Sequence, residues 1–167
     1  HNAVKRLLLQ QSVAMLQGSV KLVVDLACGK GGDLHKVTEA CPHSLYVGVD
    51  VSEESLAELK RRATRDGIVD RVLFVHACAT KLTLPTPADL ITMNFAIHYL
   101  ASSAATFESL LAAVSGALRP GGLFVGCCVD WRQLARGSCE GVTCGSDDLR
   151  DLYARPWGRQ YHYTLEG

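Results

Sequence analysis

The sequence predicts an α/β fold in which helices cover both faces of a mostly parallel sheet. Three observations support this prediction. Short β-branched apolar runs alternate with helical patterns along the chain, as βαβ units require. The length of 167 residues fits about one domain. Neither an internal repeat nor a low-complexity tract interrupts the pattern. We therefore expect one doubly wound, three-layer αβα domain.

The first elements are a helix, a strand, a turn and a second helix. Apolar residues at helical spacing predict a helix over 4–17 that ends at Gly18, because glycine commonly terminates helices. The β-branched run at 22–26 predicts a buried strand. A glycine-rich turn at 27–32 then leads into a helix over 33–40.

The alternation continues through the middle of the chain. A strand is expected at 45–50, and Ser52 then caps a helix that Gly67 closes. The segment 119–122, of sequence RPGG, predicts the stop between the last helix and the strand after it. Between Gly67 and residue 128 we expect strands at 71–76 and 89–94, a helix over 107–118 and a strand at 123–128.

The pattern weakens after Asp130. Residues 136–146 are rich in glycine and serine, which predicts a surface excursion. A short helix is expected to start at 146–148, and alternation at 160–165 predicts a final strand.

The composition excludes several functional classes. Lys+Arg and Asp+Glu number 17 each, and a formal net charge of zero argues against a protein that coats nucleic acid through its backbone. The apolar runs are far shorter than the ~20 residues of a membrane span. The seven cysteines include no Cys-x-x-Cys pair, so we expect reduced thiols and no metal site.

A glycine-rich turn and an acid after the next strand form the first candidate ligand site. Glycines within 27–32 let the backbone approach a ligand, and the following helix start offers unpaired N–H groups. Asp50 ends the second strand, where a carboxylate can accept both hydroxyls of a ribose. Together these features predict a nucleoside cofactor. The alternative is a structural turn that binds none.

NAD and S-adenosylmethionine are the two candidate cofactors. The dinucleotide fingerprint requires glycine or alanine at its sixth position, but counting from Gly29 places Leu34 there. Asp33 would repel a pyrophosphate, whereas acids such as Asp25 and Asp33 suit a cofactor that carries a positive sulfur and an amino group. The electrostatics therefore favour S-adenosylmethionine.

Four segments, in order along the chain, look like motifs of one known family. Residues 25–34, DLACGKGGDL, look like the family's cofactor loop, whose Lys-Gly-Gly-Asp extension is more specific than a general methyltransferase glycine motif. Residues 2–5, NAVK, are similar to its opening Asn-x-x-Lys, and residues 94–99, NFAIHY, to its Gln-Phe-x-x-His-Tyr segment. Residues 157–167, WGRQYHYTLEG, resemble its Phe-Gly-x-x-Tyr-x-Phe-x-Leu-Glu-Gly strand. Together the four segments resemble the eukaryotic mRNA cap guanine-N7 methyltransferases. The likeness implies a Rossmann-like methyltransferase fold.

The resemblance also implies roles for the matching residues. It assigns Lys5 to the methionine carboxylate, Asp33 to the amino end and Asp50 to the ribose of the cofactor. The other implied cofactor contacts are Ala27, Gly29, Cys78, Ala79 and Asn94. The implied contacts to the cap guanine are Phe95, His98, Tyr99 and Trp157.

The implied reaction is methyl transfer from S-adenosylmethionine to guanine N7, which leaves S-adenosylhomocysteine. Because N7 already carries a lone pair, we expect no general base and no covalent nucleophile. Catalysis would come from proximity and orientation. The implied partners are the capped 5′ end of mRNA and other capping-enzyme domains or an activating subunit, with no membrane contact. The implied location is the nucleus.

The sequence departs from the family pattern at several positions. Cys78 and Ala79 stand where the family usually has an Asp that binds the adenine amino group. Val129 replaces a proline, and the chain stops at Gly167, before a glutamate that reads the guanine. We therefore expect a single methyltransferase domain over 1–167 that lacks its last C-terminal segment. The alternative functions are a small-molecule N-methyltransferase and a non-catalytic binding protein of the same fold.

Overall fold

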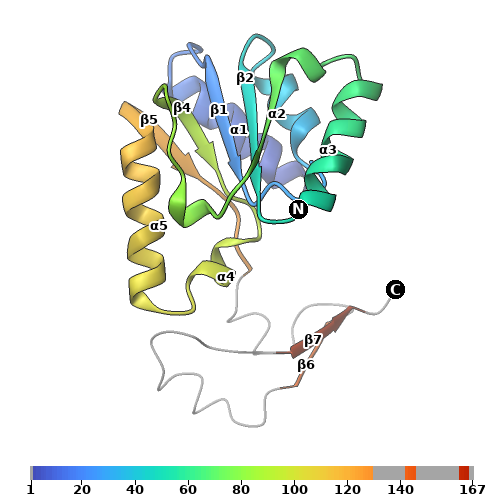
Figure 1. Ribbon diagram of the computed structural model, residues 1–167, viewed down its shortest axis with the longest axis vertical. Coiled ribbons are helices and arrows are strands. Elements are labelled where there is room, and N and C mark those ends of the chain that lie inside the picture. Colours follow the sequence, from blue (N-terminus) through green and yellow to red (C-terminus); the bar gives the residue numbers. More distant parts are fainter. Residues whose placement is uncertain (1, 130–141, 146–161, 166–167) are drawn as a thin grey trace.

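Five parallel strands form the central sheet of the computed structural model, which describes residues 2–129, 142–145 and 162–165. The strand order is β3-β2-β1-β4-β5 (Figure 1). The chain winds outward from β1 in both directions, which confirms the predicted doubly wound α/β fold. The strands are β1 (Leu22–Leu26), β2 (Leu45–Asp50), β3 (Val72–His76), β4 (Ala88–Thr92) and β5 (Leu118–Val125).

Helices cover both faces of this sheet (Figure 1). On one face lie α1 (Asn2–Met15), α2 (Leu34–Ala40) and α3 (Glu53–Arg65). On the other lie α4 (Ile97–Leu100), α5 (Ala104–Ala117) and the short 3-10 helix η2 (Ala79–Lys81). A further 3-10 turn, η1 (Val69–Arg71), precedes β3. None of the helices in the described ranges is long and apolar enough to cross a membrane.

Alternating side chains of the strands build two cores. Val23 and Tyr46 pack against α1, α2 and α3, whereas Val24 and Val47 pack against α5. Every residue of β4 is buried, as expected for a parallel strand covered on both faces. The two cores fix the sheet, and the sheet in turn fixes the loops that follow its strands.

Local signals set several element boundaries where the sequence predicted them. The strands at 22–26 and 45–50 are confirmed as β1 and β2. The Ser52 hydroxyl accepts a hydrogen bond from the Ser55 N–H (3.2 Å), and α3 follows it. Gly18 lies after α1 in the left-handed region, at φ 72°, where glycine has no steric penalty.

The predicted end of the helix before 119–122 is confirmed to within two residues, because α5 ends at Ala117. The expectation that RPGG separates the helix from the next strand is wrong, because β5 begins at Leu118, directly after α5. Ala88 pairs with Leu118 and Leu90 pairs with Leu123, so the RPGG residues form an irregularity within the strand. This distortion allows Arg119 to reach Asp89, with its Nε 2.6 Å from Oδ1. The short helix α4, which the sequence analysis did not predict, follows β4.

A second sheet consists of the antiparallel strands β6 (Val142–Gly145) and β7 (His162–Leu165). The predicted final strand is confirmed as β7, and β6 lies within the segment 136–146 that was predicted as a surface excursion. The helix start predicted at 146–148 lies outside the described residues. Within residues 2–129, all the cysteines are free thiols: Cys28, Cys41, Cys78, Cys127 and Cys128.

Candidate functional site

The turn between β1 and α2 lies at the carboxyl edge of the sheet. Ala27, Gly29 and Gly31 have φ values of 53°, 52° and 75°, and this left-handed backbone favours glycine. A Cβ at Gly31 would lie 2.3 Å from Leu59 Cδ1, so the turn packs closely against α3 there. A Cβ at Gly29 would meet nothing within 4 Å. That side of the turn is open to a ligand.

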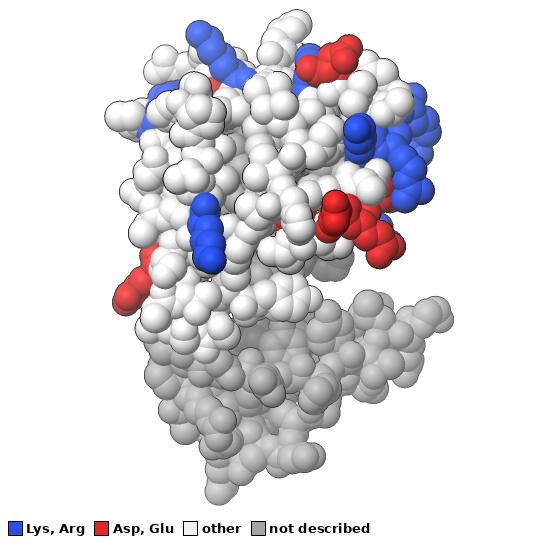
Figure 2. Space-filling model, in the orientation of Figure 1, with Lys and Arg blue, Asp and Glu red and all other residues white. Residues whose placement is uncertain are grey.

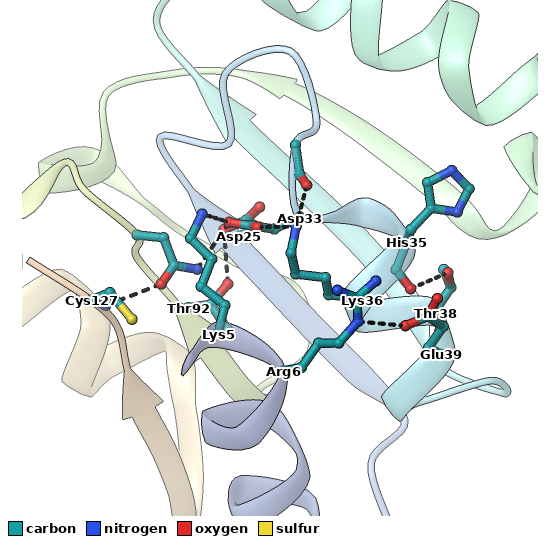
Figure 3. Close-up of polar contacts among 12 residues, drawn as sticks. Lys5, Arg6, Asp25, Asp33, His35, Lys36, Thr38, Glu39, Thr92 and Cys127 are labelled. Carbon is teal, nitrogen blue, oxygen red and sulfur yellow. Dashed lines mark hydrogen bonds and ion pairs between the residues drawn. The ribbon is translucent and has the colours of Figure 1, made fainter. Parts of the chain in front are cut away.

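Asp33 ends this turn and lies at the centre of a polar cluster (Figure 3). Its Oδ2 lies 2.6 Å from Lys5 Nζ and accepts a hydrogen bond from Asn94 Nδ2 at 3.1 Å. Its Oδ1 lies 2.9 Å from Lys36 Nζ. The cluster thus joins α1, α2 and the segment after β4. Burial opposes ionisation of Asp33, but Lys5 and Lys36 more than offset this effect and lower its pKa.

Asp50 lies beside the same turn, at the end of β2. Its Oδ2 accepts a hydrogen bond from the Gly29 N–H at 2.7 Å, and its Oδ1 accepts one from the Ser52 N–H at 2.8 Å. These two bonds fix the carboxylate between the glycine turn and the start of α3. Each oxygen keeps acceptor capacity for a further donor such as a ribose hydroxyl.

Asp25, in contrast, lies inside the sheet. Its oxygens accept hydrogen bonds from the hydroxyls of Tyr46 (2.7 Å) and Thr92 (2.8 Å), which come from the two neighbouring strands. Only 2% of Asp25 is exposed. Burial raises its pKa to about 6. The structure therefore places Asp25 beneath the turn, as a link between strands.

The segment after β4 brings polar and aromatic groups to the same edge. The Asn94 side chain accepts a hydrogen bond from the Cys127 N–H (3.0 Å), and the Phe95 N–H donates to the Cys127 carbonyl (2.7 Å). Phe95 has a φ of 56°, and the Lys5 ammonium lies 5.1 Å from its ring centroid. Asn94 therefore connects the Asp33 cluster with the end of β5.

His98 and Tyr99 are next to each other on α4. Their ring centroids are 4.2 Å apart and the rings are tilted by 43°. Tyr99 is 72% exposed. The His98 Nδ1 is buried without a hydrogen-bond partner in the described structure, and burial lowers the pKa of His98. The histidine is therefore neutral at pH 7, beside an aromatic ring that is free to stack.

Cys78 and Ala79 follow β3 at the same sheet edge. Cys78 precedes η2, and its Sγ lies 3.2 Å from Thr80 Oγ1. This hydrogen bond lowers the pKa of Cys78. Ala79 is buried in the core. Trp157, the remaining residue that the sequence assigned to the site, lies outside the described residues.

Comparison with known proteins adds the family. The profile of the mRNA (guanine-N(7))-methyltransferase domain matches residues 1–167. The chain belongs to this family. It is 32% identical over 170 residues to mRNA cap guanine-N(7) methyltransferase 1 of Oryza sativa subsp. japonica, covering 86% of this chain and 46% of that protein. It is 29% identical over 167 residues to the mRNA cap guanine-N(7) methyltransferase of Caenorhabditis elegans, covering 86% of this chain and 44% of that protein. The chain thus spans less than half the length of these relatives.

Solved structures agree with the cap methyltransferase family in fold. An S-adenosylmethionine-dependent methyltransferase from Clostridium acetobutylicum superposes with a TM-score of 0.66 at 22% identity, covering 86% of this chain and 58% of that one. The amino pentose methyltransferase CalS10 superposes with a TM-score of 0.60 at 24% identity, covering 71% of this chain and 46% of that one. The predicted Rossmann-like methyltransferase fold is therefore confirmed.

Sequence reasoning missed three residues around the site of this methyltransferase domain. Lys36 contacts Asp33, and Tyr46 and Thr92 hold Asp25. The three-residue spacing of Asp33 and Lys36 was a usable signal, because residues that far apart share a helix face. The partners of Asp25 come from other strands, and no local pattern shows such contacts.

Proposed function

We propose that this chain binds S-adenosylmethionine at the carboxyl edge of its sheet and methylates N7 of the guanine cap of mRNA. The observation that carries the proposal is that one edge presents both a charged cluster of Lys5 and Asp33 and the imidazole–phenol pair of α4. Membership of the cap methyltransferase family supports the choice of substrate.

The charged groups fit the amino-acid end of the proposed cofactor. That end carries one ammonium and one carboxylate, and the cluster offers a cation at Lys5 and an anion at Asp33, 2.6 Å apart. Asp50 is held where its free acceptor capacity can take the ribose hydroxyls, and the open side of Gly29 leaves room beside it. The bound cofactor supplies an electrophilic methyl group. The remaining contacts proposed for it are Ala27, Cys78, Ala79 and Asn94.

The aromatic groups fit a guanine. Tyr99 is exposed and can stack on a base, an interaction worth about 1–3 kcal/mol per base. A neutral His98 would not repel the positive charge that a purine acquires when N7 is methylated. Phe95 lies in the sequence between Asn94, which contacts Asp33, and His98. We assign it to the same guanine-binding surface as His98 and Tyr99. No base needs to remove a proton from N7, so these residues act by holding the guanine in line.

Methyl transfer to a capped RNA tests the proposal. The full-length protein, given S-adenosylmethionine with a labelled methyl group and GpppG-capped RNA, should produce 7-methylguanosine. The Tyr99→Ala variant should bind the cap about tenfold more weakly, because a stacking platform is lost, and should bind S-adenosylhomocysteine as the wild type does.

Two results would contradict this function. Transfer to a small amine but not to the cap would favour a small-molecule N-methyltransferase. Failure to bind either S-adenosylmethionine or S-adenosylhomocysteine would favour a non-catalytic binding protein, for which the cysteine at position 78 is the best argument. We also propose a nuclear location and association with other capping-enzyme domains or an activating subunit. Fractionation and co-purification of the native protein test these two points.

A further inference from the structure

We propose that Lys36 is a positioning residue of this site: it holds the Asp33 carboxylate in the orientation that meets the ammonium group of the cofactor. The inference rests on the proposed function, because it presumes a ligand with an amino-acid end. Lys36 belongs to none of the residues assigned above to cofactor or cap.

The contacts of Lys36 connect the glycine turn with the Asp33 carboxylate. Its Nζ lies 2.9 Å from Asp33 Oδ1 and donates a hydrogen bond to the Gly32 carbonyl at 2.7 Å. The other oxygen of Asp33 is shared by Lys5 and Asn94. Figure 3 shows the two lysine side chains reaching this carboxylate from different helices. Each oxygen of Asp33 therefore has a cation within 2.9 Å, and Oδ1, which is buried without a hydrogen bond in the described structure, keeps acceptor capacity for a ligand.

The burial of Lys36 indicates that its charge, and not only its volume, is used. Its side chain is 8% exposed, and burying an ammonium carries a large desolvation penalty unless it is well paired. Lys36 also lines a pocket of about 290 Å³ between α1 and α2. An apolar side chain could fill this space without the penalty. The other residues that line the pocket are Arg6, Gln10, Val13, Glu39 and Ala40.

Lys5 and Lys36 have different roles when a ligand binds. Lys5 must turn toward the ligand's carboxylate, and one ammonium cannot then neutralise Asp33 to the same extent. The buried Asp25 carboxylate lies close enough to repel the charge on Asp33. Lys36, which is fixed to the Gly32 carbonyl, is the cation that stays with Asp33. Lys36 keeps the Asp33 carboxylate ionised and oriented toward the ligand's ammonium group while Lys5 binds the ligand's carboxylate.

The test separates a positioning role from a structural one by the choice of ligand. Calorimetry measures the binding of S-adenosylhomocysteine and of its analogue without the α-amino group. Lys36→Met should weaken S-adenosylhomocysteine about tenfold, as the loss of a charge-assisted contact does. It should leave the deamino analogue within about twofold. Lys36→Arg should bind S-adenosylhomocysteine nearly as the wild type does, since the neighbouring pocket has room for the longer side chain.

Lys60→Met, at an exposed lysine of α3, is the matched control and should change neither affinity. Melting temperatures verify that each variant is folded, and Lys36→Gln replaces Lys36→Met if the latter does not fold. Equal weakening of both ligands, or no weakening of S-adenosylhomocysteine, would overturn the role of Lys36 and leave the proposed function intact. A wild-type chain that binds no S-adenosylhomocysteine would overturn both.

Discussion

Asp25 and Asp33 are two neighbouring carboxylates whose surroundings shift their pKa values in opposite directions. Burial raises the pKa of Asp25 to about 6, although hydrogen bonds from Tyr46 and Thr92 oppose it. Burial also acts to raise the pKa of Asp33, but Lys5 and Lys36 outweigh this effect, and the pKa of Asp33 is lowered. Asp33 therefore carries the stable negative charge of the site, and Asp25 supports the strands beneath it.

Replacing Asp25 with Asn should stabilise the fold, and more at pH 7.5 than at pH 4.5. The folded pKa of about 6 exceeds the ordinary aspartate pKa of 3.8. The folded state therefore binds this proton more tightly, and wild-type stability falls as pH rises through that interval. The gain of Asp25→Asn should reach about 3 kcal/mol at pH 7.5. An amide can still bond both hydroxyls. Urea unfolding at the two pH values measures the stability gain of Asp25→Asn. A gain that does not depend on pH would contradict this prediction.

The elements differ in how far local sequence specifies them. The strands β1 and β2 have the predicted bounds because each is an uninterrupted apolar run between turn residues. The β5 strand extends into RPGG because pairing with β4 and the Arg119–Asp89 contact outweigh the turn preference of those residues. Four residues are too few to show helical periodicity, which is why α4 was not predicted.

The site was predictable in part for the same reasons. Because carboxyl ends of parallel strands share one edge, the placement of Asp33 and Asp50 near the glycine turn could be anticipated. The contact of Lys5 with Asp33 joins residues 28 positions apart, and no spacing rule predicts it. The pairing of His98 with the exposed Tyr99 depends on α4, which the sequence pattern did not show.

Two glycines of the turn should respond differently to alanine. Both have positive φ, so Gly29→Ala should destabilise the fold by about 1 kcal/mol. Gly31→Ala should destabilise it by about 2–4 kcal/mol, because the new Cβ would also collide with Leu59 Cδ1. Denaturant unfolding compares them. In a double variant with Leu59→Ala, the added effect of Gly31→Ala should fall toward that of Gly29→Ala. Equal losses for the two single variants would refute the packing argument.

At the scale of the whole molecule, charges are grouped at separate places around a neutral chain. Basic side chains gather over α3 (Figure 2), where Arg61 and Arg62 pair with Glu58. The Lys5–Asp33 cluster lies at the carboxyl edge of the sheet, after β1 and β4. Asp89 lies near the opposite edge, at the start of β4. A net charge of zero therefore allows local sites of both signs, as the charged amino-acid end of the proposed cofactor requires.

The separation of the two edges predicts that stability and ligand binding can be changed independently. Asp89 Oδ2 accepts hydrogen bonds from the N–H groups of Lys21 (2.8 Å) and Leu22 (2.9 Å), and its Oδ1 pairs with Arg119. Asp89→Ala should therefore lower the free energy of unfolding by about 2 kcal/mol, because these groups lose their acceptor. It should leave the Kd for S-adenosylhomocysteine unchanged, since the site lies at the other end of the strands.

Lowering the pH should remove the contribution of the Asp89 carboxylate to the stability of the fold. Burial opposes its ionisation, but Arg119 and the two backbone N–H groups lower its pKa in the fold. Its stabilising effect is therefore complete above the unfolded pKa and is lost as pH falls through the lower, folded pKa. The stability difference between wild type and Asp89→Asn should be constant from pH 6 to 8 and shrink below pH 4 in urea unfolding. If Asp89→Asn weakened ligand binding with no loss of stability, the two edges would be coupled and this division of the molecule would be wrong.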